Sequence, residues 1–218
     1  RKYYENGIDE ILYEDIVASL YERNSLLDII ERASSNVFVP ITVGGGLRSV
    51  EDVSAVLKAG ADKVSINTAA TKRPSLITEV ANAFGSQCMV LSIQAKSHGN
   101  QWEAYYDNGR EHSHLDAVEW ARRGEELGAG EILLTSVDRD GTGKGMDLEL
   151  IKAVTDHVSI PVIASGGVGE LSDIQNAVAL SNADAVAMAS VLHYEKFSIN
   201  AVRKYAFDQG LPVRPWAD

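Results

Sequence analysis

The sequence predicts an α/β fold, a (β/α)8 TIM barrel, from three observations. Strand-like apolar runs alternate with amphipathic helical stretches along the whole chain, an order typical of parallel strands joined by right-handed crossovers. The chain also repeats itself with a shift of 121 residues. Polar and glycine-rich residues gather where the apolar runs end, which is where barrels of parallel strands carry their active sites.

The strand-like and helical segments follow one another strictly. We expect strands at residues 10–17, 38–43, 63–67, 88–94, 131–137, 161–165 and 185–189. Apolar residues at three- and four-residue spacing predict helices at 25–34, 49–60, 74–85, 115–128, 147–158 and 171–181. Residues 1–7 are typical of the last turn of a helix that ends at a capping glycine, Gly7.

The internal repeat indicates two half-barrels. The shift of 121 residues places Gly45-Gly46 on Gly166-Gly167, Asp52 on Asp173, and Glu10 on Glu131. The unit that begins at Cys88 then has no mate, so we expect the barrel to be N-terminally incomplete, with its first strand and most of the first helix preceding Arg1. Two open sheet edges would make such a chain poorly soluble or prone to associate.

Length and composition are consistent with a single barrel domain over residues 1–218. Of these residues 45% are hydrophobic, which is enough for one large core. The formal net charge of −11 argues against a nucleic-acid partner, because binding to the phosphate backbone needs clustered Lys and Arg. Backbone N–H groups in a local turn can still bind a phosphorylated small molecule.

The cysteine content and the hydropathy pattern favour a cytoplasmic protein with no membrane partner. The single cysteine, Cys88, lies within the apolar run CMVLSI, so it forms no intrachain disulfide and is expected to be inert core. No apolar stretch approaches the ~20 residues of a membrane span, and the first residues do not lead into a signal-peptide apolar region.

One insert interrupts the alternation of strands and helices. Residues 101–112, QWEAYYDNGREH, carry alternating aromatic residues around an Asn-Gly pair, which is a strong signal for a β-hairpin. We expect a small ribbon over the active face that acts as a lid or a wall.

The candidate binding residues follow the strands. Two glycine-rich turns at symmetry-related positions, each followed one strand later by small polar residues, predict phosphate binding at both ends of an elongated ligand. Bare glycine turns are also common as simple tight turns. The predicted phosphate-binding residues are Gly45, Gly46, Asn67, Thr68, Gly141, Gly166, Gly167 and Ser190, and the other ligand-contacting candidates are Asp15, Lys96 and Ser165.

Two strand ends carry candidates for proton transfer. Asp138 ends its strand, where a carboxylate acts as acid or base or holds a ribose hydroxyl; capping of its own loop is the alternative. Gln94 occupies a strand end suited to an acid, but an amide does not transfer protons at neutral pH.

Three charged residues begin alternate strands at the other end of the barrel. Glu10, Lys63 and Glu131 are expected to meet there, because alternate strands share a layer of interior side chains. Buried charges persist when they are paired, so this cluster is either a structural plug of ion pairs or a gate for something small that passes up the barrel. The five histidines complete no metal-binding spacing, so we expect no metal and no cofactor.

With these residues in view, the chain closely resembles the cyclase subunit of imidazole glycerol phosphate synthase, a half-barrel repeat protein of histidine biosynthesis. The resemblance covers essentially all 218 residues, and the motifs that carry it include GIDEILYEDI, ITVGGGLRSVED, GADKVSINTAA, FGSQCMVLSIQAK, WEAYYDNGRE, ELGAGEILLTSVDRDGTGKG, SIPVIASGGVG and FSINAVRKYAFDQGLPVR.

The resemblance implies a reaction and a partner. Ammonia from a glutaminase subunit docked at the barrel bottom would travel through the barrel and attack a doubly phosphorylated ribulosyl aminoimidazole carboxamide nucleotide, giving imidazole glycerol phosphate. Glu10, Lys63 and Glu131 resemble the family's ammonia gate, and Asp138 resembles a ligand-contacting acid. The residues that resemble its two phosphate sites are Gly46, Asn67, Thr68, Gly166, Gly167 and Ser190.

Two departures from the family pattern leave alternatives open. Gln94 stands where the family has one of its two catalytic aspartates, and the other aspartate belongs to the strand expected before Arg1. The loop ASLYERNSL is more similar to paralogues associated with amidation of bacterial surface sugars. The chain is therefore either a cyclase that tolerates Gln94 or uses Asp138, or a noncatalytic ammonia conduit for a sugar amidotransferase; a homologue that binds another sugar phosphate is a third reading.

Overall fold

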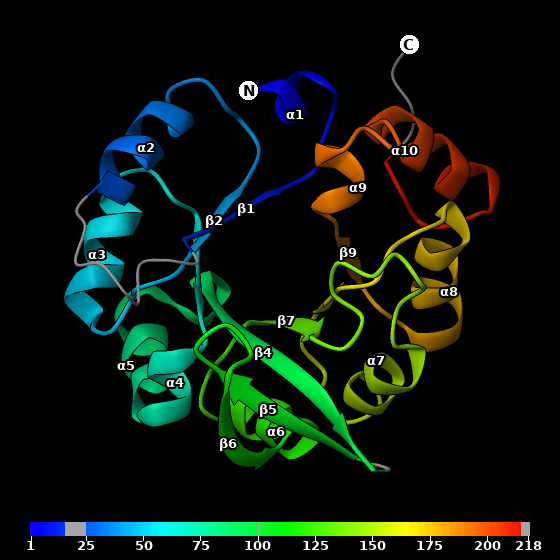
Figure 1. Cartoon of the computed structure of the whole chain (residues 1–218). Coiled ribbons are helices and arrows are strands. Elements are labelled where there is room, and N and C mark those ends of the chain that lie inside the picture. Colours follow the sequence, from blue (N-terminus) through cyan, green and yellow to red (C-terminus); the bar gives the residue numbers. More distant parts are fainter. Residues whose placement is uncertain (16–24, 100, 215–218) are drawn as a thin grey trace.

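The structure, a computed structural model, describes residues 1–15, 25–99 and 101–214. Parallel strands form one curved sheet surrounded by a ring of helices (Figure 1). Along the sheet the order is β1 (Ile11–Glu14), β2 (Ile41–Gly44), β3 (Lys63–Ile66), β4 (Met89–His98), β7 (Glu131–Ser136), β8 (Val162–Ser165) and β9 (Ala185–Ala187). The predicted (β/α)8 TIM-barrel class is confirmed as a nearly closed barrel, and all seven predicted strands are present.

The six predicted helices are confirmed, with ends that fall at or just inside the expected limits. They are α2 (Ser25–Ser34), α3 (Val50–Lys58), α5 (Ser75–Phe84), α6 (Ala117–Glu126), α7 (Leu148–Thr155) and α8 (Leu171–Ser181). The remaining helices are α1 (Lys2–Glu5), α4 (Thr68–Lys72), α9 (Ser190–His193), α10 (Ile199–Asp208) and the 3-10 turn η1 (Ser86–Cys88). Among the described residues no helix is long and apolar enough to cross a membrane.

The sequence repeat has a structural basis in two pairs of aspartates. Asp52 accepts hydrogen bonds from the backbone at the start of α3, and Asp173 does the same at the start of α8. Asp62 accepts from the Ile41 amide at 2.8 Å, and Asp184 accepts from the Val162 amide at 2.9 Å. The repeated aspartates therefore cap helices and fix strand ends in both halves.

The core lies between the outer face of the sheet and the helices. Val64 and Ile66 of β3 are buried in this core. Because side chains alternate along a strand, Lys63 and Ser65 face the barrel axis. Cys88 is buried in the same core, where burial raises the pKa of its thiol.

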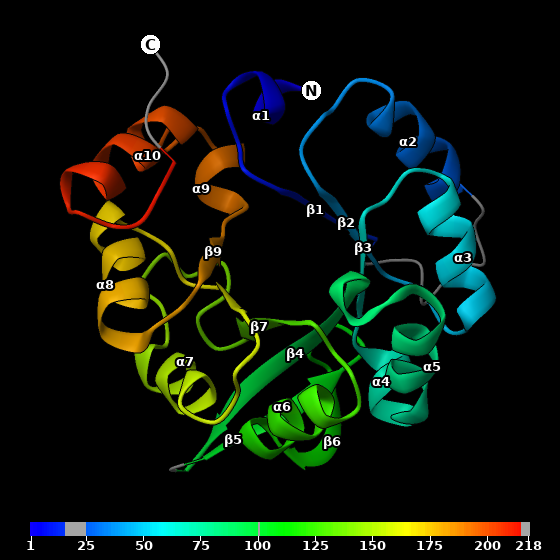
Figure 2. The same ribbon diagram turned by 180° about the vertical axis from the view of Figure 1, so that it is seen from behind.

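The two ends of the sheet, β1 and β9, do not pair with each other within the described ranges. Helices α1, α9 and α10 lie along this side of the ring (Figures 1 and 2), and side chains near the chain ends connect them. The Arg203 guanidinium, 9% exposed, lies 2.8 Å from the Asp9 carboxylate, and the Tyr3 hydroxyl lies 2.5 Å from Nδ1 of His193. Contacts of α1 and its following loop with α9 and α10 therefore hold the ring together here.

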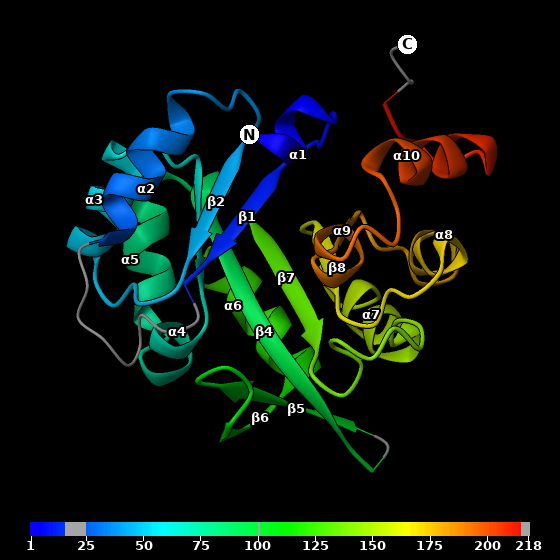
Figure 3. The same cartoon turned by 45° about the horizontal axis from the view of Figure 1, so that its top comes forward.

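The hairpin consists of β5 (Gln101–Tyr106) and β6 (Glu111–Asp116), which pair antiparallel. Strand β4 continues past its parallel neighbour β7 and pairs with β5, so the hairpin extends the barrel sheet (Figure 3). Its strands run four residues further than the expected insert. The predicted strand 10–17 ends outside the described residues, as does most of the loop ASLYERNSL.

Candidate functional site

The predicted ligand-binding residues lie at one end of the barrel. Gln94 and Lys96 belong to the last part of β4, Ser165 ends β8, and Asp15 and Asp138 follow β1 and β7. Because the strands are parallel, their carboxyl ends meet at the same end of the barrel. The remaining predicted positions follow the strands at that end, in loops at Gly45, Gly46, Asn67, Gly141, Gly166 and Gly167 and at the first residues of α4 and α9, Thr68 and Ser190.

Asn67 and Thr68 use their side chains to hold the hairpin. The Asn67 amide donates to the carbonyl oxygens of Ser92, at 3.0 Å, and Tyr105, at 3.1 Å. The Thr68 hydroxyl accepts from the Asp107 backbone amide at 3.1 Å. These side chains, expected to contact phosphate, therefore dock the hairpin turn over the end of β3.

The two glycine-rich turns are required by close backbone packing. Gly45, with φ +95°, abuts the backbone of Asp15, and a side chain there would collide with the Asp15 carbonyl. Gly167, with φ +101°, accepts a hydrogen bond from Gly145 at 2.9 Å and packs as tightly against that residue. The two turns thus hold neighbouring loops together at the carboxyl ends of the strands. Backbone N–H groups in such turns are a kind of group that binds anions.

Asp138 has a defined structural contact. Its carboxylate accepts a hydrogen bond of 2.7 Å from the Ser97 amide, which ties the loop after β7 to the extension of β4. A hollow of about 570 Å³ adjoins it, lined in part by Ser97, Asp138, Arg139, Thr142 and Lys144. Asp138 is exposed, so its carboxylate both holds the Ser97 amide of β4 and faces a cavity with two cationic neighbours.

Buried polar atoms without hydrogen-bond partners mark two of the predicted positions. In the described part of the chain such atoms are Gln94 Oε1, Glu131 Oε2 and Trp120 Nε1. An unpaired buried polar group destabilises the fold by about 1–3 kcal/mol, so its presence calls for a reason other than stability. Gln94 and Glu131 stand at opposite ends of the barrel axis, one at each predicted site.

Lys63 brings the three predicted charges together at the amino-terminal end of the strands. Its ammonium lies 2.6 Å from Glu131 and 3.2 Å from Glu10. Burial lowers the pKa of Lys63, but hydrogen bonds and charge attraction, first from Glu131 and then from Glu10, outweigh it and raise the pKa overall. The lysine therefore stays charged within a three-residue ion-pair network.

Glu14, which sequence reasoning missed, also faces the barrel axis. Much of the residue is accessible, but its carboxylate tip lies against Gly44 and accepts a hydrogen bond of 2.9 Å from the Ser65 hydroxyl. Burial of this tip raises the pKa of the carboxyl, and the Ser65 hydrogen bond opposes part of the rise. The signal in the sequence is its even spacing from Glu10, the residue that precedes β1, because an even spacing in extended backbone places both side chains on the same face.

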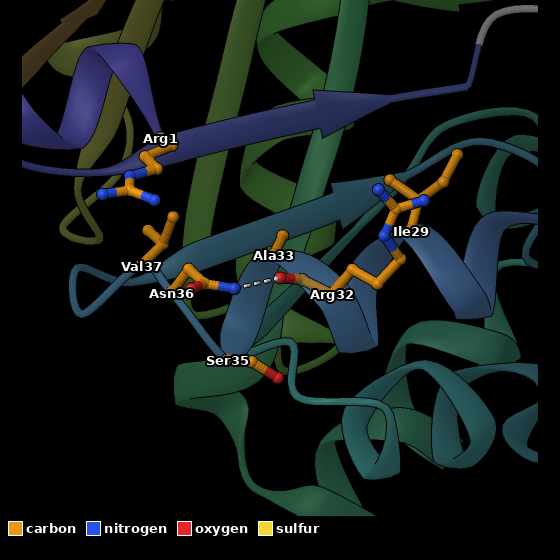
Figure 4. A pocket seen from close by; sticks show the side chains of 7 residues that line it. All are labelled: Arg1, Ile29, Arg32, Ala33, Ser35, Asn36 and Val37. Carbon is orange, nitrogen blue, oxygen red and sulfur yellow. Dashed lines mark hydrogen bonds between the residues drawn. The ribbon is translucent and has the colours of Figure 1, made fainter.

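A second hollow, of about 490 Å³, lies away from these residues. It is lined by the end of α2, the segment that enters β2, and Arg1 (Figure 4). Asn36 there donates to the Arg32 carbonyl at 3.1 Å. None of the predicted site residues lines this hollow, so the strand ends remain the candidate site.

Comparison with known proteins identifies a family and relatives that share one name. Residues 1–198 match the family described as "Histidine biosynthesis protein". The chain is 62% identical over 172 residues to the imidazole glycerol phosphate synthase subunit HisF of Legionella pneumophila, covering 78% of this chain and 81% of that protein. It is 50% identical over 213 residues to the same subunit of Dehalococcoides mccartyi, strains BAV1 and CBDB1, covering 98% of this chain and 84% of the relative.

Proposed function

The chain belongs to the histidine biosynthesis protein family, and from this membership we infer that it is the cyclase subunit of an imidazole glycerol phosphate synthase. The observation that carries this function is the 50% identity to a relative of that name over 98% of the chain. Because the relatives are named as subunits, the protein works with a second subunit, which we propose to be a glutaminase.

We propose that the two ends of the barrel divide the reaction. The partner docks at the end where Lys63, Glu10 and Glu131 form their network, and ammonia enters beside these side chains. The doubly phosphorylated nucleotide binds at the opposite end, with its phosphates at the turns of Gly45-Gly46 and Gly166-Gly167. Support comes from the positive φ of all four glycines. It also comes from the position of the ion pairs at the amino-terminal ends of the strands, whereas the glycine turns follow the carboxyl ends.

Asp138 is proposed as the acid that contacts the nucleotide, with Arg139 and Lys144 in the adjoining hollow suited to anionic groups. Gln94 replaces a carboxyl group that the family resemblance places there, and loss of a positioned proton-transfer group lowers rates by about 10²- to 10⁴-fold. A cyclase with Gln94 therefore needs another proton donor.

The deciding experiment supplies the ribulosyl nucleotide and an ammonium salt to the purified protein and follows consumption of the nucleotide. We expect turnover that Asp138→Asn lowers by about 10²-fold or more. Asp140→Asn, two residues further along the same loop, serves as the matched control and should retain most of the activity. No turnover by the wild type, together with activation of a glutaminase on mixing, would contradict the cyclase function and favour the ammonia conduit.

A further inference from the structure

Beside Gln94, the hairpin holds a hydrogen-bonded chain of three titratable side chains. The Tyr105 hydroxyl lies 3.2 Å from Nε2 of His112, and Nδ1 of His112 lies 3.1 Å from the Glu103 carboxylate. Glu103 also accepts from the His114 backbone amide at 2.8 Å. With Nδ1 facing a carboxylate, the imidazole carries its proton there, and Nε2 is left to accept from the phenol.

The chain of side chains lies at the mouth of the barrel. Tyr105 is the direct antiparallel partner of Gln94, and Lys96 is the partner of Glu103, so all four side chains share one face of the extended sheet. The Lys96 ammonium lies 4.5 Å from the centre of the Tyr105 ring. The Asn67 amide binds the Tyr105 carbonyl, which fixes this residue to the end of β3.

The donor of the chain is buried and its middle member is exposed, as delivery of a proton from solvent requires. Tyr105 is 8% exposed and the Glu103 side chain 15%, whereas the His112 side chain is 56% exposed. The phenol therefore lies at the protected end, and the imidazole exchanges protons with water. Burial and the nearby charges of Glu103 and Asp138 raise the pKa of Tyr105, which keeps the phenol protonated as a donor.

We propose that Tyr105, His112 and Glu103 form a proton relay that protonates the reacting nucleotide in place of the carboxyl group absent at Gln94. The inference rests on the proposed cyclase function. Condensation of ammonia with the ketone of the ribulosyl group gives an amino alcohol that must lose its hydroxyl as water, and this step needs a proton donor. Glu103 acts as a positioning residue, because it orients His112 and does not itself transfer the proton.

The proton transfers balance in three steps. The Tyr105 O–H bond breaks and its proton joins the hydroxyl; the C–O bond of the amino alcohol breaks with its electron pair going to the departing water, and the nitrogen lone pair forms the C=N bond of an iminium. The phenolate takes a proton from Nε2 of protonated His112. The neutral imidazole takes a proton from solvent, so the sum is one proton moved from water to the leaving group. Protonation of His112 also makes Nε2 a donor to the phenol oxygen, which frees the phenol hydrogen to turn toward the nucleotide.

The relay is tested with Tyr105→Phe, His112→Asn and Glu103→Gln in the ammonium-driven assay. We expect Tyr105→Phe to lower kcat by about 10²-fold with little change in the KM for the nucleotide. His112→Asn should remove one ionisation from the pH profile of kcat, and Glu103→Gln should displace that ionisation. Tyr106→Phe is the matched control, because Tyr106 is the next residue of β5 and faces the other side of the hairpin.

The outcomes separate the relay from the function on which it depends. Wild-type turnover with kcat and pH profile unchanged in Tyr105→Phe and His112→Asn would overturn the relay alone. Absence of wild-type turnover would overturn the function and the relay together. A loss of kcat in Tyr105→Phe that Tyr106→Phe reproduces, or that comes with altered melting of the protein, would identify a structural role and also overturn the relay.

Discussion

The Lys63 ammonium lies 2.6 Å from the Glu131 carboxylate, although 68 residues separate them in the chain. Both side chains are largely buried, at 17% and 18% exposure, whereas the second partner of Lys63, Glu10, is 46% exposed. One lysine thus joins a buried ion pair to a more exposed one at the amino-terminal end of the barrel.

This difference in burial predicts unequal losses of stability. Lys63→Met should lower the free energy of unfolding by about 3 kcal/mol, because it leaves the Glu131 charge buried without a partner. Glu10→Gln should cost at most about 1 kcal/mol. Urea denaturation measures both, and the double variant Lys63→Met/Glu131→Leu should recover most of the loss. Equal losses for Lys63→Met and the double variant would contradict a buried pair.

The proposed ammonia route makes a separate prediction for the same cluster. Glu10→Gln disturbs the network on its exposed side, so we expect it to change turnover driven by glutamine and the partner subunit. Turnover driven by an ammonium salt should stay near the wild-type rate, because ammonia then reaches the nucleotide from solvent. The ratio of the two rates is the measurement, and an unchanged ratio would support a purely structural plug.

Restoring an acid at the end of β4 should raise the rate. Gln94→Asp is expected to increase kcat in the ammonium-driven assay by about 10²-fold, whereas Gln94→Asn, which shortens the side chain equally but keeps the amide, should give no increase. If the relay operates, Tyr105→Phe should cost less in the Gln94→Asp background, because two proton donors then serve the same step. Equal rates for the Asp and Asn variants would contradict a proton-transfer role for this position.

The glycine turns predict a contrast between Gly45 and Gly141. Both have positive φ, but a side chain at Gly45 would collide with the Asp15 backbone, while nothing lies within 4 Å of one at Gly141. Gly141→Ala should therefore cost about 1 kcal/mol for the backbone alone, and Gly45→Ala about 2–4 kcal/mol. Thermal and urea unfolding measure the difference. A smaller loss for Gly45→Ala than for Gly141→Ala would contradict the packing described for this turn.

Acid should remove the stabilising effect of Glu103. Burial raises its pKa, but hydrogen bonds from His112 and the His114 amide outweigh this and leave the pKa below its ordinary value. A carboxyl group whose pKa is lower in the folded than in the unfolded protein stabilises the fold at pH values above its unfolded pKa. This stabilisation is lost as the pH falls through its pKa in the folded state. Glu103→Gln should therefore be less stable than the wild type at neutral pH, with the gap closing below about pH 4.

Glu14 provides the control of opposite sign. Its pKa is raised by burial, so its ionised form opposes folding above the ordinary pKa of a glutamate. Glu14→Gln should be at least as stable as the wild type at neutral pH, and the difference should also vanish on acidification. Melting temperatures across pH 3–8 distinguish the two glutamates. A stability change of the same sign for Glu103→Gln and Glu14→Gln at neutral pH would contradict the environments described for them.

The sequence by itself determined the strands, the helices and their repetition. Val64 and Ile66 follow the apolar period of a strand, and Asp52 and Asp173 cap helices only three residues from the backbone groups that they bind, so period and repeat spacing were sufficient to locate these elements. Glu10, Lys63 and Glu131 could be assigned to one layer because the parallel order of strands fixes which of their ends meet.

Only the tertiary structure decided what the side chains contact. Asn67 and Thr68 face hairpin backbone that is distant in the chain, and Asp138 holds the Ser97 amide. The alignment of Tyr105 with both Gln94 and His112 depends on the register of two strand pairs and on an irregularity between Ala104 and Tyr105. A shift of one residue in either register would turn these side chains to opposite faces, and the period of the sequence does not specify that register.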